Sequence, residues 1–78
     1  MKRYFIVVFI ANCDNRQTGG MEILHSNLNV ISDDGKFPKR SYLVETIRNN
    51  NPNLEFKKDP LIYNIMELSE IDWMDYNS

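Results

Sequence analysis

The feature that most constrains this chain is an unbroken apolar run near its start, from Tyr4 to Ala11. Its β-branched and aromatic residues are typical of a strand, and both alternating sets of positions are apolar. A strand that is apolar on both faces is normally central in its sheet and covered on both sides. With only 78 residues, the chain can form one domain at most, so we expect a single domain over residues 1–78.

Four further elements are marked by apolar spacing and turn residues. They are an edge strand at 21–27, a helix at about 39–49 opened by Pro38, a strand at 61–66 and a short helix at 69–76 capped by Ser69. Leu28, Val30 and Ile31 could prolong the edge strand past a bulge.

This order predicts a small α+β domain of the β-β-α-β-α type. A right-handed crossover makes the second and third strands parallel, so the first lies between them and antiparallel to both. The result is a three-stranded antiparallel sheet of order 2-1-3, with the main helix on one face and the short C-terminal helix on the other. We expect that short helix to turn Leu68, Ile71 and Met74 inward. The short helix leaves part of this face uncovered, so we expect a homo-oligomer or a surface that binds a partner.

The charge balance and the N-terminal residues limit which classes of partner and which cellular location are expected. Nine basic residues against eleven acidic ones give a net charge of −2, which provides no basic field and argues against a nucleic-acid partner. Lys2 and Arg3 before the apolar run imitate a secretory signal, but no small-residue cleavage site follows. The run is also too short to span a bilayer. We therefore expect a cytoplasmic protein with no membrane partner.

A single cysteine and a single histidine limit the chemistry. Because Cys13 is the only cysteine, the chain has no intrachain disulfide and no Cys-rich metal site. Because His25 is the only histidine, it has no His-rich metal site. If Gln17 lies at the hairpin centre, Cys13 pairs near Met21 and His25 near Phe9, which separates the two by roughly 13 Å. The chain is therefore predicted to have no catalytic residues, metal or cofactor, and not to be an enzyme. The four C-terminal carboxylates favour a solvated acidic face over a metal site: Glu67, Glu70, Asp72 and Asp75.

The start of the main helix carries cations where helix stability favours acidic residues. Free N–H groups beside lysines and arginines suit a phosphate or a carboxylate, and aromatic rings could stack on a base. The topology brings Arg3 to the same end of the sheet. We therefore predict a site for a small anionic, nucleotide-like ligand, the alternative being a solvated basic edge. The predicted ligand-binding residues are Arg3, Lys36, Phe37, Lys39, Arg40, Ser41 and Tyr42.

A second candidate surface lies in the C-terminal helix. Trp73 and Tyr76 share one side of it, and exposed aromatic residues concentrate in protein interfaces. They could form a contact patch for a protein partner, or equally a lid over a second core.

Two segments carry a resemblance: Gly35-Lys36-Phe37-Pro38 at a helix start, and the stretch from Asn64 to Asp72. Together they resemble small proteins carried by phages and mobile elements of gut bacteria. Some phage anti-defence proteins sequester nucleotide-derived immune signals. By that analogy the resemblance implies a non-enzymatic sponge for a cyclic oligonucleotide or an ADP-ribose derivative, acting in the host cytoplasm. The alternative is a protein-binding inhibitor or adaptor that uses a sheet edge or the Trp73/Tyr76 patch.

Overall fold

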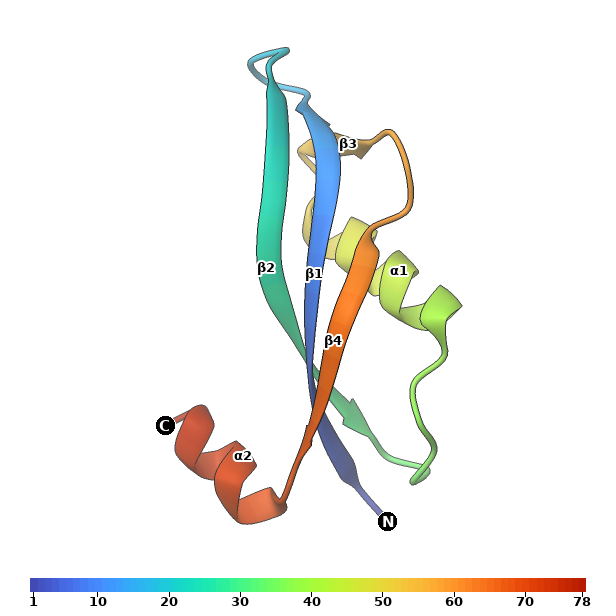
Figure 1. The fold of residues 1–78 in the computed structure, drawn as a ribbon, viewed down its shortest axis with the longest axis vertical. Coiled ribbons are helices and arrows are strands. Elements are labelled where there is room, and N and C mark those ends of the chain that lie inside the picture. Colours follow the sequence, from blue (N-terminus) through green and yellow to red (C-terminus); the bar gives the residue numbers. More distant parts are fainter.

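The computed structural model describes residues 1–78 as a four-stranded antiparallel sheet with two helices (Figure 1). The elements are β1 (Arg3–Asn15), β2 (Met21–Ser32), α1 (Arg40–Asn50), β3 (Leu54–Phe56), β4 (Leu61–Leu68) and α2 (Glu70–Tyr76). Strand β1 is central, bonded to β2 on one side and to β3 and β4 on the other. The α+β class, the two helices and the antiparallel central first strand are confirmed. The prediction of three strands is wrong, because β3 adds a fourth beside the end of β1.

Strands β1 and β2 form a long hairpin whose register runs without a break from Tyr4 opposite Ile31 to Asp14 opposite Met21. The suggested bulge in β2 is absent, and the strand continues in register to Ser32. In the connecting loop, Asn15 Oδ1 accepts hydrogen bonds from the backbone N–H groups of the two residues that follow Arg16, and Gly19 takes a positive φ of 73°. Local side-chain to backbone bonds of this kind fix a tight loop.

The observed hairpin register differs by one residue from the expected one. Cys13 lies opposite Glu22, and His25 lies opposite Ile10. Because side chains alternate between the two faces of a strand, a shift of one residue moves a side chain to the other face. Cys13 and His25 therefore lie on opposite faces of the sheet.

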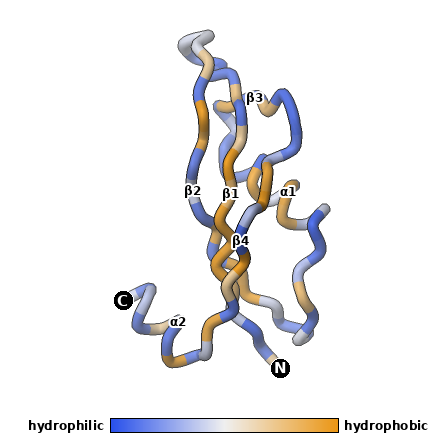
Figure 2. The backbone as a smooth tube through the Cα atoms, viewed as in Figure 1, coloured by the Kyte–Doolittle hydropathy of each residue, from blue (hydrophilic) through white to orange (hydrophobic).

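Helix α1 covers the face formed by the odd-numbered residues of β1, and the main core lies between them. The helix buries Leu43, Val44 and Ile47. A cluster at this interface contains Phe5, Val7, Val30 and Leu43, and partly buried residues of β2 and β4 pack around it. Figure 2 shows the hydrophobic course of β1 running through the middle of the sheet. Only 11 of the 78 residues are buried, so this core is small even for a chain of this length.

Helix α2 covers only one end of the opposite face. Its cap is as predicted, because Ser69 Oγ accepts a hydrogen bond from the N–H of Asp72 at 3.1 Å. The expected inward stripe is wrong for two of its three residues: Leu68 is partly buried, but Ile71 is 73% exposed and Met74 is 64% exposed. Instead Trp73 packs against the sheet, and Figure 1 shows α2 at the end of the molecule away from the hairpin.

Candidate functional site

The main candidate site is a pocket of about 410 Å³ beside the start of α1, between the end of β2 and the loop that precedes the helix. We call it the helix-start pocket. Four of the seven predicted ligand residues line it, namely Lys36, Phe37, Lys39 and Tyr42. Its other walls come from Val30, Ile31, Ser32, Asp33, Asp34 and Pro38.

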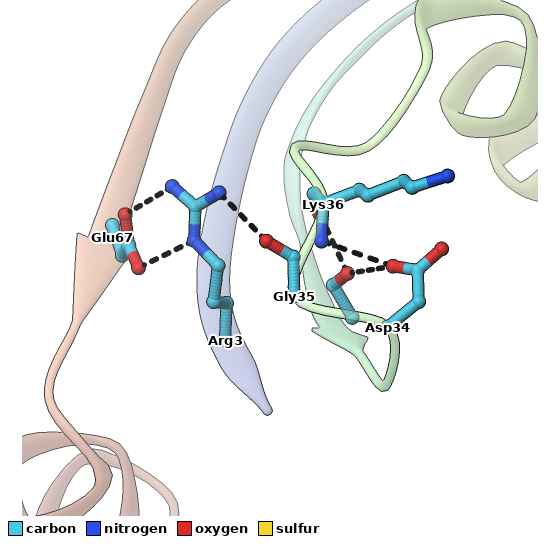
Figure 3. Close-up of polar contacts among 6 residues, drawn as sticks. Arg3, Asp34, Gly35, Lys36 and Glu67 are labelled. Carbon is cyan, nitrogen blue, oxygen red and sulfur yellow. Dashed lines mark hydrogen bonds and ion pairs between the residues drawn. The ribbon is translucent and has the colours of Figure 1, made fainter. Parts of the chain in front are cut away.

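The two lysines of the pocket share it with Asp33 and Asp34 but form no ion pair. The four ion pairs of the structure include neither Lys36 nor Lys39. Asp34 borders the same pocket, but its Oδ1 accepts hydrogen bonds from the Lys36 backbone N–H at 3.0 Å and from Ser32 Oγ at 2.9 Å. These two bonds, the backbone one first, hold the pKa of Asp34 below its ordinary value. Figure 3 shows the Lys36 side chain extending to the same side of the loop as the Asp34 carboxylate, with no ion pair drawn between them.

The two aromatic rings of the pocket are partly free. Phe37 packs edge-on against Phe5, with ring centroids 5.2 Å apart and an interplanar angle of 73°. This contact fixes the ring, yet Phe37 and Tyr42 both keep more than half of their surface exposed. A flat ligand can therefore stack on either ring without displacing a core contact.

Arg3 does not border the helix-start pocket. Its Nε and Nη2 donate to the two carboxylate oxygens of Glu67 at 2.9 and 2.8 Å, and its Nη1 donates to the Gly35 carbonyl at 3.1 Å (Figure 3). The paired hydrogen bonds raise the pKa of Arg3 and lower the pKa of Glu67. Arg3 therefore ties β1 to β4 and to the loop before α1, and its donors are used inside the protein.

Arg40 and Ser41 also lie outside the pocket lining. Arg40 Nη1 is 3.9 Å from Asp59 Oδ2, and the same carboxylate binds Arg48. In an α-helix, residues two positions apart point about 200° away from each other, so Arg40 and Tyr42 face opposite sides of α1. Of the three cations predicted at the helix start, Lys36 and Lys39 line the pocket, whereas Arg40 lies beside the Asp59 carboxylate.

The two aromatic residues of α2 contact the protein's own sheet. The Trp73 ring lies 5.4 Å from the Tyr4 ring, measured between centroids. Tyr76 Oη accepts a hydrogen bond from Asn27 Nδ2 at 3.4 Å. Trp73 therefore packs on the sheet, while Tyr76 remains half exposed.

The two remaining reactive side chains, Cys13 and His25, lie apart on opposite faces of the sheet. Cys13 is buried, and this burial, followed by the nearby charges of Glu22 and Asp14, raises the pKa of its thiol. His25 lies on the other face and hydrogen-bonds Tyr63. No three side chains of His, Cys, Asp or Glu are gathered in the way a metal ion requires.

A second surface takes up much of the sheet face that α2 leaves uncovered. We call it the open face. It consists of Val8, Ile10, Met21, Ile23, His25, Leu61, Tyr63 and Met66. Tyr63 joins it because β4 shifts register between the partners of Val8 and Phe9. An irregularity of this kind depends on pairing between distant segments, so no local sequence signal marks it.

No protein-family model, curated protein or solved structure matches this chain. Neither helix is long and apolar enough to cross a membrane.

Proposed function

We propose that this protein is a non-enzymatic binding protein that holds a small anionic, nucleotide-derived molecule in the helix-start pocket. The observation that supports this most directly is one cavity bordered by two unpaired lysines and two exposed rings. Ammonium groups bind phosphate as compact point charges, and aromatic faces stack on bases. A volume of about 410 Å³ is within the range of small-ligand sites.

The backbone at the start of α1 adds donors to this pocket. The first helical hydrogen bond runs from the N–H of Leu43 to the carbonyl of Lys39, so the N–H groups before it have no intrahelical partner. The first turn contains no acidic residue that would occupy them. Because Asp33 and Asp34 also line the pocket, the anionic group of a ligand is expected at Lys39 and the free N–H groups of the helix start, away from these carboxylates.

The biological role in this proposal is the capture of an immune signal of the cyclic oligonucleotide or ADP-ribose type in the host cytoplasm. It rests on the resemblance of the segments Gly35–Pro38 and Asn64–Asp72 to phage and mobile-element proteins. Capture requires affinity and no chemistry. That requirement agrees with Cys13 and His25 lying on opposite faces, where neither can activate the other.

Calorimetry against a panel of cyclic oligonucleotides and ADP-ribose derivatives tests the proposal. We expect one of them to bind the wild-type protein, and Lys36→Gln/Lys39→Gln to weaken that binding by more than about tenfold. Arg40→Gln is the matched control, since it removes a cation from the same helix start but outside the pocket. Well-folded protein that binds nothing in the panel contradicts the proposal, as does equal weakening in the control.

A second candidate function is a protein-binding inhibitor or adaptor, and the edge of the sheet favours it. Strand β2 is an edge strand of 12 residues with a single charged side chain, Glu22. Long edges with few charges offer unpaired backbone groups to another chain. Native mass spectrometry of protein purified from its natural host separates the two functions. A small-molecule adduct favours the ligand pocket, and a stoichiometric complex with another protein favours the adaptor.

A further inference from the structure

We propose that two copies of this chain form a homodimer through their open faces. The proposal is independent of the ligand proposed above, because no open-face residue lines the helix-start pocket. Helix α1 buries one face of the sheet, and the second copy buries most of what α2 leaves exposed on the other.

The accessible surface of a single copy is too large for a compact monomer. It measures 5537 Å², whereas a compact protein of 9.2 kDa exposes about 4,900 Å². The excess is about 600 Å² per copy. A dimer that buried this excess on both copies would bury about 1,200 Å² in total, which reaches the lower end of stable, specific interfaces.

The overall dimensions support the same conclusion. The radius of gyration is 13.9 Å, against about 11.5 Å for a compact domain of this length. The molecule measures 42 × 26 × 19 Å, and Figure 1 shows a narrow sheet with α1 on one side and α2 at one end. The missing layer is on the side of the open face, where a second copy would supply it.

The open face has an apolar centre that extends across three strands, and Asn27 and Asn64 flank this centre at Val8. Ile10 of β1 is flanked by His25 of β2 and Leu61 of β4, and Ile23 is the next residue of β2 on this face. Ile23 is 70% exposed and Leu61 is 61% exposed. The polar pair on this face, His25 and Tyr63, hydrogen-bond each other. Their mutual hydrogen bond would be kept when the face is buried, so neither His25 Nε2 nor Tyr63 Oη would lose its partner.

The chemistry of this face suits a copy of itself. Its charged residues lie at the hairpin edge, where Asp14 is opposite Met21 and Glu55 and forms an ion pair with Lys57. The centre of the face has no charged side chain, so two copies can meet there without repulsion between like charges. Two exposed asparagines, Asn12 and Asn64, share the face through their register with β2 and β1. A carboxamide contains both donors and an acceptor, so it can pair with another carboxamide across a two-fold axis.

The two ends of the molecule indicate an antiparallel arrangement of the copies. Glu70, Asp72 and Asp75 of α2 form no ion pair within the chain, and neither do Arg16 and Lys58 at the hairpin end. When the open faces stack with their strands in opposite directions, α2 of each copy approaches the hairpin end of its partner. The hairpin end also carries Asp14, Glu22 and Glu55, so it is not basic overall. The antiparallel arrangement still brings Arg16 and Lys58 toward the acidic α2 of the partner, whereas a parallel arrangement would place two acidic helices together.

Sedimentation velocity over a wide range of protein concentrations tests the dimer. We expect the wild-type protein to approach twice 9.2 kDa as concentration rises. Ile23→Lys and Leu61→Lys each place a charge in the apolar centre and should weaken dimerisation by more than about tenfold. Asn49→Lys is the control, because it adds the same charge to an exposed position of α1. Circular dichroism at low concentration checks that every variant is folded, which is expected for such exposed positions.

Several other results would overturn the dimer or its proposed arrangement. A wild-type protein that stays at 9.2 kDa at every concentration overturns the proposal, as does a dimer that both open-face variants leave intact. If the two copies instead paired through their β2 edges, the outward backbone amides of β2 would be protected from hydrogen exchange. Such protection would overturn the assignment of the interface to the open face. The double variant Arg16→Glu/Lys58→Glu should weaken the dimer several-fold. If it does not, the antiparallel arrangement is wrong.

Discussion

Replacing Leu43 by alanine tests whether the small core under α1 maintains the fold. Leu43 is 1% exposed and packs with Phe5, Val7 and Val30. Removing a buried leucine side chain costs about 2–5 kcal/mol, and a core of this size supplies only about 3–5 kcal/mol. The variant should therefore lose most of its free energy of unfolding, and its Tm should fall by more than about 10 °C if it folds at all.

Thermal and urea unfolding followed by circular dichroism measure this effect. Wild type, Leu43→Ala and the control Ile71→Ala should be compared at the same low protein concentration, so that association does not contribute. Ile71 is 73% exposed, so its loss should change the free energy of unfolding by less than about 0.5 kcal/mol. A loss below about 1 kcal/mol for Leu43→Ala would refute the packing described between α1 and the sheet.

Three further outcomes follow from single contacts. Ser69→Ala should destabilise α2 by about 1 kcal/mol, and a red shift of Trp73 fluorescence would report its release from the sheet; an unchanged spectrum contradicts this. Because Arg3 lowers the pKa of Glu67, the ionised carboxylate stabilises the folded state at neutral pH, and this contribution disappears as pH falls through the lowered pKa. Urea unfolding should therefore show wild type more stable than Glu67→Gln at neutral pH, with the difference vanishing in acid. Cys13 is buried with a raised thiol pKa, so a thiol reagent should label it slowly in the native protein and rapidly in urea; fast native labelling would contradict its burial.

Several elements could be predicted because their signals lie in adjacent residues. The two-sided apolar pattern of Tyr4–Ala11 identified the central strand, and Ser69 identified the start of α2 through a bond to a residue three positions away. The helix-start pocket was partly predictable for the same reason. Its lining comes from one continuous stretch, residues 30–42, so nearness in the sequence implied nearness in space.

The errors arose where position depends on distant contacts. Arg3 and Arg40 were expected at the pocket, but their carboxylate partners, Glu67 and Asp59, come from later parts of the chain. Strand β3 has three residues, too few for a periodic pattern. Helix α2 has seven residues, so its orientation follows the contact of Trp73 with the sheet rather than its own apolar spacing.

The central place of β1 also has a consequence for the rate and order of folding. Its pairing with β2 closes over a short loop, from Asp14 opposite Met21, and hairpins of this kind form in about 1–10 μs. Its pairing with β4 joins Tyr4 to Leu68 across most of the chain, and contacts between such distant residues form slowly. We expect the hairpin to nucleate folding and the docking of β4 to limit the rate. Substitutions in β4 should therefore slow refolding less than those in the hairpin and accelerate unfolding more.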